Sequence, residues 1–197
     1  MKLKFYDEGH IYEYRGEVIP SVSEILRFLS REVYGEIDKY ILDHAADRGT
    51  RVHRATEMLD KTGETDCDAD IAGYVEAYAR FLREHTVSWQ AIEKPLAHPT
   101  MRYAGTIDRY GDLDGRRAVV DLKTNATVKK TLVKAQLNAY RKLCRARRWP
   151  VDALYCLQLL RDGRYRLYPV ALDDAEFMAC YRLHVASAKK QPRGRIL

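Results

Sequence analysis

The feature that most constrains the fold is a change of hydrophobic period near residue 87. Before it, apolar residues recur at helical spacing, and the expected helices cover residues 21–29, 36–61 and 69–84. After it, the pattern is that of strands, and the first three expected strands cover residues 87–96, 103–110 and 117–122. Helices that precede a hairpin-rich sheet predict a mixed α/β or α+β fold.

Local signals add detail to this outline. Residues 9–20 are typical of a short hairpin, and Ser21 with Glu24 forms a capping box that starts a helix. The second helix is expected to break at residues 47–49, and a turn at residues 111–115 joins two strands. The remaining elements are a helix over residues 128–148, strands over 153–160 and 165–170, and a last helix from Asp173 to about residue 188.

The length of 197 residues fits one domain, with helices in residues 1–86 and a sheet core in residues 87–197. The chain has no apolar run that could cross a bilayer and no secretory leader, so a cytoplasmic protein without a membrane partner is expected. The net charge of +6 is compatible with a polyanionic partner.

The four cysteines follow no metal-site spacing. Cys67, Cys144, Cys156 and Cys180 lie far apart and form no CxxC pair. We therefore expect reduced thiols, and neither a zinc site nor an iron–sulfur cluster.

Two carboxylates and a lysine dominate the candidate chemistry. Asp121 and Lys123 lie two apart on an expected strand and share a face, and Asp108 lies on the strand before. An Mg²⁺ or Mn²⁺ ion would relieve the repulsion between the carboxylates, and the backbone carbonyl of Leu122 offers a further oxygen ligand. The same residues also fit a charged, water-facing hairpin, although the apolar neighbour Val120 argues against full exposure.

Two helical pairs repeat a four-residue spacing. His53 and Glu57 share a helix face beside the apolar stripe, which leaves either a site histidine or an exposed one. Gln136 and Tyr140 share a face of the helix after Lys123, where a core tyrosine is the alternative.

Together these segments resemble the PD-(D/E)XK nuclease superfamily, in particular its RecB-like and phage-exonuclease branch. The matching segments are Gly105-x-x-Asp108, Asp121-x-Lys123, the GTxxHxxxE pattern of residues 49–57 and the QxxxY pattern of residues 136–140. With the leader of residues 10–26, the resemblance covers residues 9–140. Ile107 stands where the family name has proline, and the four-cysteine cluster of some relatives is absent.

The resemblance implies a restriction-endonuclease-like core, with a central mixed sheet flanked by helices. It implies that His53 is a metal ligand together with Asp108 and Asp121, and that Glu57 holds His53 or a metal-bound water. Lys123 would be the catalytic lysine beside the metal, and Gln136 and Tyr140 would bind phosphate or fix this lysine. Glu93 corresponds to a carboxylate that related nucleases often carry on this strand, which makes it a further candidate for a metal ligand or for a residue that supports one.

The expected function is Mg²⁺/Mn²⁺-dependent hydrolysis of DNA, as in phage or prophage exonucleases of recombination, repair or genome processing. A non-catalytic nucleic-acid-binding protein on the same scaffold is the alternative. A small-molecule metallohydrolase fits less well, because no second histidine-rich motif occurs. The DNA substrate could be single- or double-stranded, and a homo-oligomer or a recombination partner protein is compatible with the sequence.

Overall fold

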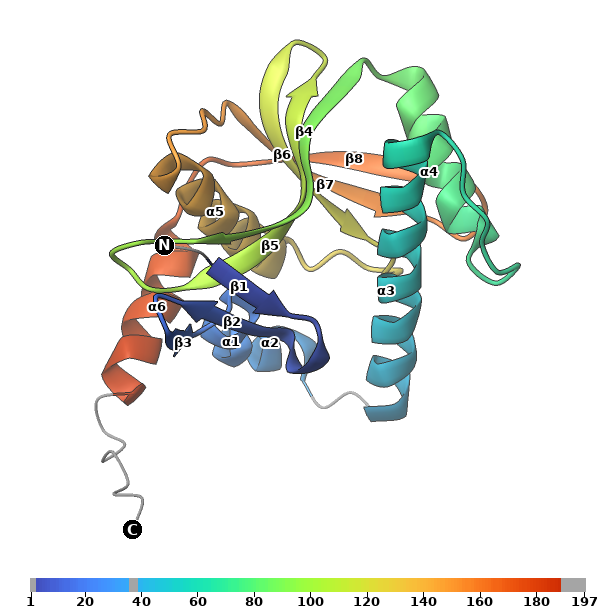
Figure 1. Ribbon diagram of the computed structural model, residues 1–197. Coiled ribbons are helices and arrows are strands. Elements are labelled where there is room, and N and C mark those ends of the chain that lie inside the picture. The colour runs from blue at the N-terminus through green and yellow to red at the C-terminus, as the bar shows by residue number, and fades with distance from the viewer. Residues whose placement is uncertain (1–2, 36–38, 189–197) are drawn as a thin grey trace.

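The larger of two sheets forms the centre of the computed structural model, which describes residues 3–35 and 39–188 (Figure 1). Its strand order is β4-β5-β6-β7-β8. The strands are Val87–Ala97 (β4), Ala104–Leu113 (β5), Arg116–Lys123 (β6), Ala153–Leu159 (β7) and Tyr165–Val170 (β8). β6 and β7 are parallel and the other neighbours antiparallel, so the sheet is mixed. The predicted mixed α/β fold is confirmed.

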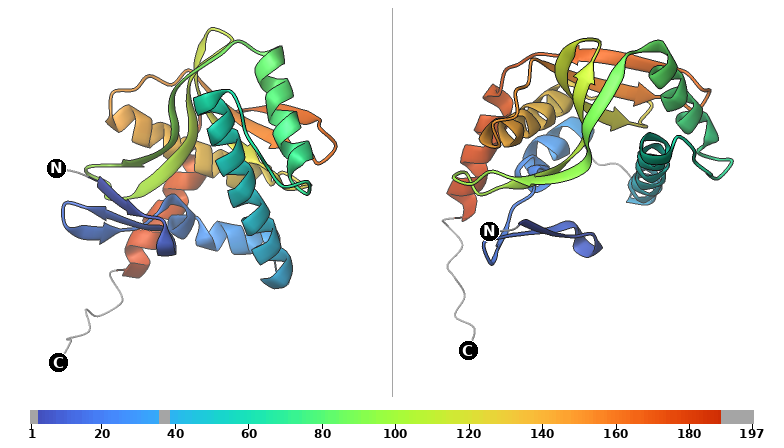
Figure 2. Two further views of the ribbon diagram at one scale, coloured as in Figure 1. Left: turned by 45° about the vertical axis from the view of Figure 1, so that its right-hand side comes forward. Right: turned by 45° about the horizontal axis from the view of Figure 1, so that its top comes forward.

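Helices cover both faces of this sheet (Figure 2). The parallel pair β6–β7 needs a crossover, which α5 (Lys130–Ala146) supplies. Val119 of β6 packs in one core with residues of α5, α6 (Ala175–Ala188) and α1 (Val22–Ile25). Its neighbour Val120 packs in a second core, formed with α3 (Lys39–Thr62) and α4 (Ala72–Glu84). The apolar run of β6 is therefore buried on both faces, which excludes the water-facing hairpin.

A smaller antiparallel sheet lies at the N-terminus, in the order β1-β2-β3. It contains β1 (Leu3–Tyr6), the 3₁₀ turn η1 (Glu8–His10), β2 (Ile11–Tyr14) and β3 (Glu17–Ile19). The sequence predicts the β2–β3 hairpin but not β1. Tyr12 and Ile19 anchor this sheet against Ala97 and Ala104 at the far ends of β4 and β5.

Two expected boundaries are wrong. The capping box at Ser21 and Glu24 is present, but α1 ends at Ile25, and α2 (Arg27–Tyr34) extends beyond the expected end of the helix. The expected turn at residues 111–115 is shorter, because β5 continues to Leu113.

The expected break at residues 47–49 is also wrong, since α3 is continuous from Lys39 to Thr62. The expected start at residue 36 lies outside the described residues. Arg51 bonds Asp47 one turn back at 3.0 Å and reaches Asp70 beyond the helix at 2.6 Å. These contacts help to hold the helix together through Gly49.

Replacing Gly49 with alanine should stabilise the protein. Glycine inside a helix costs about 0.5–1 kcal/mol relative to alanine. A Cβ at Gly49 would lie 3.9 Å from Thr124 Oγ1, which is ordinary contact. We expect the Tm of Gly49→Ala to rise by roughly 2 °C in calorimetry. A lower Tm would mean that the methyl group meets a neighbour.

No helix among the described residues is long and apolar enough to span a membrane. All four cysteines are free, and Cys144, Cys156 and Cys180 are buried.

Candidate active site

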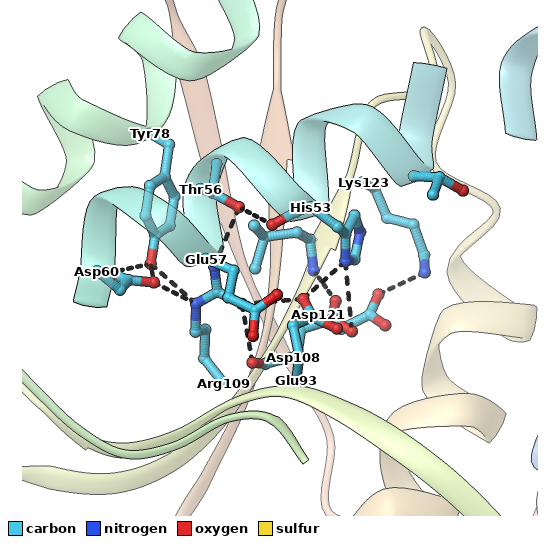
Figure 3. Close-up of polar contacts among 12 residues, drawn as sticks. His53, Thr56, Glu57, Asp60, Tyr78, Glu93, Asp108, Arg109, Asp121 and Lys123 are labelled. Carbon is cyan, nitrogen blue, oxygen red and sulfur yellow. Dashed lines mark hydrogen bonds and ion pairs between the residues drawn. The ribbon is translucent and has the colours of Figure 1, made fainter. Parts of the chain in front are cut away.

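A cleft of about 730 Å³ opens between the N-terminal sheet, α3 and one end of strands β4–β6. Its lining includes His53 of α3, Glu93 of β4, Asp108 of β5 and Lys123 of β6. These side chains come from four different elements, a helix and three consecutive strands (Figure 3).

Three of these side chains form a group with the chemistry of a metal site. His53 Nδ1 lies 3.0 Å from Glu93 Oε1 and 3.8 Å from Asp108 Oδ1. One ligand atom from each of the three residues lies within 4.8 Å of the others. An imidazole with two carboxylates suits Mn²⁺ and also permits Mg²⁺.

The strands bring the two carboxylates of this group together. Glu93 lies between residues of β4 that pair with Ile107 and Arg109, and so it is opposite Asp108. Its φ of 43° is left-handed. Such strain costs about 1–3 kcal/mol and persists only where the surroundings hold it. On the other side, Asp108 Oδ2 accepts a 2.7 Å hydrogen bond from the backbone N–H of Leu122 in β6.

Asp121 and Lys123 form a second part of the site. Lys123 Nζ lies 2.7 Å from Asp121 Oδ2, and Asp121 is 1% exposed, whereas the side chain of Lys123 reaches the cleft. Arg109 pairs with Val120, which places Asp108 next to Asp121 on adjoining strands. The structure thus brings Asp108, Asp121 and Lys123 together, but it groups Glu93, rather than Asp121, with His53.

The electrostatics are those of a carboxylate cluster that lacks positive charge. Burial raises the pKa of Asp108, and it raises that of Asp121 to about 6, although Lys123 acts in the opposite direction. Burial disfavours protonated His53, but the charges of Asp108 and Glu93 raise its pKa to about 9. In the absence of a cation, the cluster therefore tends to bind protons.

The charge balance fits one divalent cation. Four carboxylates around the site, those of Asp60, Glu93, Asp108 and Asp121, face two permanent cations, Arg109 and Lys123. With neutral His53, two negative charges remain. A divalent ion would neutralise them, and His53, Glu93 and Asp108 are the residues placed to hold it.

The helix after Lys123 adds a phenol to the cleft. Gln136 Nε2 donates to Tyr140 Oη at 2.9 Å, and Tyr140, unlike Gln136, lines the cleft. Burial and the nearby carboxylates raise the pKa of Tyr140 well above its usual value, so it stays a hydrogen-bond donor. Gly105 makes this approach possible, because a Cβ there would lie 2.8 Å from the Tyr140 ring.

The two other expected site residues also line the cleft. The carboxylate of Glu57 lies 2.5 Å from Lys61 Nζ, one turn along α3. The expectation that Glu57 holds His53 remains a prediction. Leu122 lies beside Asp108 through the backbone bond described above, and its carbonyl remains a candidate ligand.

The sequence analysis missed a buried network behind Glu93. Arg109 is fully buried, and its guanidinium donates to Glu93 Oε1 at 3.0 Å, Asp60 Oδ2 at 2.5 Å and Thr56 Oγ1 at 3.0 Å. Tyr78 of α4 donates to the same Asp60 carboxylate. An arginine directly after Asp108, with Thr56 and Asp60 four apart on a helix, is the signal that could have found it.

Comparisons with known proteins give distant likenesses. No family model matches the sequence, and no curated protein matches it. Three solved structures are similar over most of their length: the alkaline exonuclease LHK-Exo from Laribacter hongkongensis (15% identity, TM-score 0.47, 86% of this chain and 87% of that one), SSO0001 (14%, 0.37, 87% and 87%) and LHK-Exo in complex with dAMP (15%, 0.32, 87% and 92%). With TM-scores below 0.5, they establish no function for this chain.

Proposed function

We propose that the chain is a nuclease that hydrolyses phosphodiester bonds of DNA with the help of Mg²⁺ or Mn²⁺. The observation that carries this proposal is the group of His53, Glu93 and Asp108 in a cleft that also contains the Lys123 ammonium. Such a cleft joins a place for a divalent cation to a positive charge for a phosphate.

The cation, when bound, would polarise a phosphate oxygen and lower the pKa of a water molecule. The residues of the chain supply the remaining functions. Lys123 faces the cleft and offsets negative charge that develops on the phosphoryl oxygens as water attacks phosphorus and the bond to the leaving oxygen breaks. Asp121 keeps Lys123 protonated and in place through the 2.7 Å ion pair. Tyr140, which Gln136 orients, can donate a hydrogen bond to a phosphate oxygen.

Removal of the metal provides the first test. The protein should cleave labelled single- or double-stranded DNA with Mn²⁺, lose activity in EDTA and recover it when Mn²⁺ is restored. Asp108→Asn should lose this activity and bind Mn²⁺ at least about tenfold more weakly in calorimetry, because a carboxylate ligand is lost. Asp112→Asn on the same strand is the matched control. Metal-independent DNA binding without cleavage would favour the non-catalytic alternative.

Metal binding should depend strongly on pH. Since the pKa of His53 is raised to about 9 and a metal needs the neutral imidazole, binding at pH 7–8 should expel a proton. The affinity for Mn²⁺ should then rise up to about tenfold per pH unit in that range. Calorimetry in buffers of different ionisation enthalpy measures the protons released, and no release at pH 7.5 would contradict the prediction.

The raised pKa of His53 also determines how the stability of the metal-free fold changes with pH. In the metal-free protein, protonated His53 stabilises the fold fully below its unfolded pKa near 6.5, and this contribution is lost as the pH rises through about 9. Added Mn²⁺ should offset the loss.

A further inference from the structure

Three rings of the N-terminal sheet gather on one wall of the cleft. Phe5 and Tyr12 pack with their centroids 4.8 Å apart and their planes tilted by 32°. His10 stands nearly perpendicular to both, at 5.0 Å from Phe5 and 5.3 Å from Tyr12. Tyr12 is 1% exposed and forms the base of this ring corner, whereas Phe5 is half-buried and His10 exposed.

The ring corner is held in place before any ligand binds. Tyr12 Oη lies 2.9 Å from Thr106 Oγ1 and 3.1 Å from His10 Nε2. Thr106 lies two residues before Asp108 on β5 and so ties the corner to the strand that bears a candidate metal ligand. His10 has a left-handed φ of 52°, a strained conformation for a residue other than glycine.

The corner and the candidate metal site share one cleft. Phe5, His10 and Tyr12 line it together with Asp108 and Lys123. Residues of the N-terminal sheet and of α3 both line the cleft, and these two elements are separate in both views of Figure 2.

The opposite wall of the cleft is formed by α3, which an ion pair connects to the N-terminal sheet. Ala45, Ala46 and Gly49 of α3 line the cleft there and leave it wide. An exposed ion pair of 3.3 Å, between Asp7 and Arg54, connects the N-terminal sheet to α3.

We propose that the ring corner is a stacking site for an unpaired nucleobase of the strand that is cleaved. The inference rests on the proposed function and specifies its substrate as single-stranded DNA or a frayed end. The wall with Lys123 suits a phosphate, and the wall with Phe5 and His10 suits the flat face of a base. A base inside a duplex already has both faces stacked on its neighbours, so the corner suits an unpaired base.

The decisive variant is Phe5→Leu/His10→Asn. Leucine keeps the apolar contact with Tyr12, and asparagine tolerates the left-handed backbone of residue 10. We expect kcat/KM on single-stranded DNA to fall by about tenfold, as for loss of base–aromatic stacking. On oligonucleotides whose terminal nucleotides are abasic, the variant and the wild type should be equal.

Tyr6→Leu is the matched control. Tyr6 follows Phe5 on β1, is 45% exposed and bonds Glu13 away from the cleft. Tyr6→Leu should leave kcat/KM unchanged on both the normal and the abasic oligonucleotides. Equal losses for the double variant on normal and abasic strands would mean that the rings only shape the cleft, and the stacking site would be rejected.

A binding measurement separates this inference from the nuclease proposal. In the Lys123→Ala background, an oligonucleotide with terminal 2-aminopurine should lose fluorescence on binding, and Phe5→Leu/His10→Asn should restore it. If the quenching depends on the rings but the wild-type protein cleaves no DNA, the stacking site is retained and the nuclease proposal is rejected. Quenching that persists without the rings overturns the stacking site whatever the activity.

Discussion

Lys123→Ala should lower the rate of DNA hydrolysis by at least about 100-fold, the usual effect of removing one charge-stabilising group from an active site. The Lys123 ammonium is the positive charge that β6 presents to the cleft, and its carboxylate partner Asp121 cannot replace it. Single-turnover kinetics with Mn²⁺ and labelled DNA measure the chemical step directly.

The fold should survive this change. Without Lys123, the pKa of Asp121 should rise further above its present value of about 6, and the carboxyl group can take up a proton instead of remaining a buried charge. Circular dichroism and DNA binding should therefore change little. Lys4→Ala is the matched control, because it also removes a lysine paired with an acidic residue, Glu13, but outside the cleft. Full activity of Lys123→Ala would refute the role assigned to this residue.

Arg109→Met should lower the free energy of unfolding by about 3–5 kcal/mol, the cost of leaving buried carboxylates without their partner. Arg109 is the fully buried cation that joins Asp60 of α3 to Glu93 of β4, and its loss leaves both uncompensated. Urea denaturation gives the size of the effect, and a loss below about 1 kcal/mol would contradict the prediction.

A second substitution tests the cause. Asp60→Asn in the Arg109→Met background removes one of the uncompensated charges and should recover part of the stability, since neutral replacements of buried ion pairs are tolerated. It should not restore metal binding, because Glu93 still lacks the guanidinium that fixes its Oε1 at 3.0 Å. The affinity for Mn²⁺ thus distinguishes the role of Arg109 in positioning Glu93 from its role in stabilising the fold.

The sequence revealed those parts of the molecule whose pattern is local. β6 could be predicted because its apolar run is continuous, and the two-residue period put Asp121 and Lys123 on one face. The helix spacing likewise placed His53 outside the apolar stripe, and the structure has it facing the cleft.

Other parts depend on contacts between distant segments. Glu93 contacts His53 from a left-handed position in the middle of β4, and no alternation of apolar residues reveals such a position. The buried Arg109 guanidinium is satisfied by hydrogen bonds to Asp60 and Tyr78, which lie on two different helices. The unbroken α3 likewise has a distant contact, since Arg51 reaches Asp70 beyond the end of the helix.

The strained backbone at Glu93 has an evolutionary consequence. A β-branched residue such as valine or isoleucine, which strands usually favour, would fit this position poorly, because it tolerates a positive φ badly. Only glycine, asparagine, aspartate or a similarly tolerant side chain could replace Glu93 without straightening β4 at this point. Substitution at this one position is therefore confined to a small set of residues, most of which would remove or shorten the carboxylate next to Asp108 while leaving the strand intact.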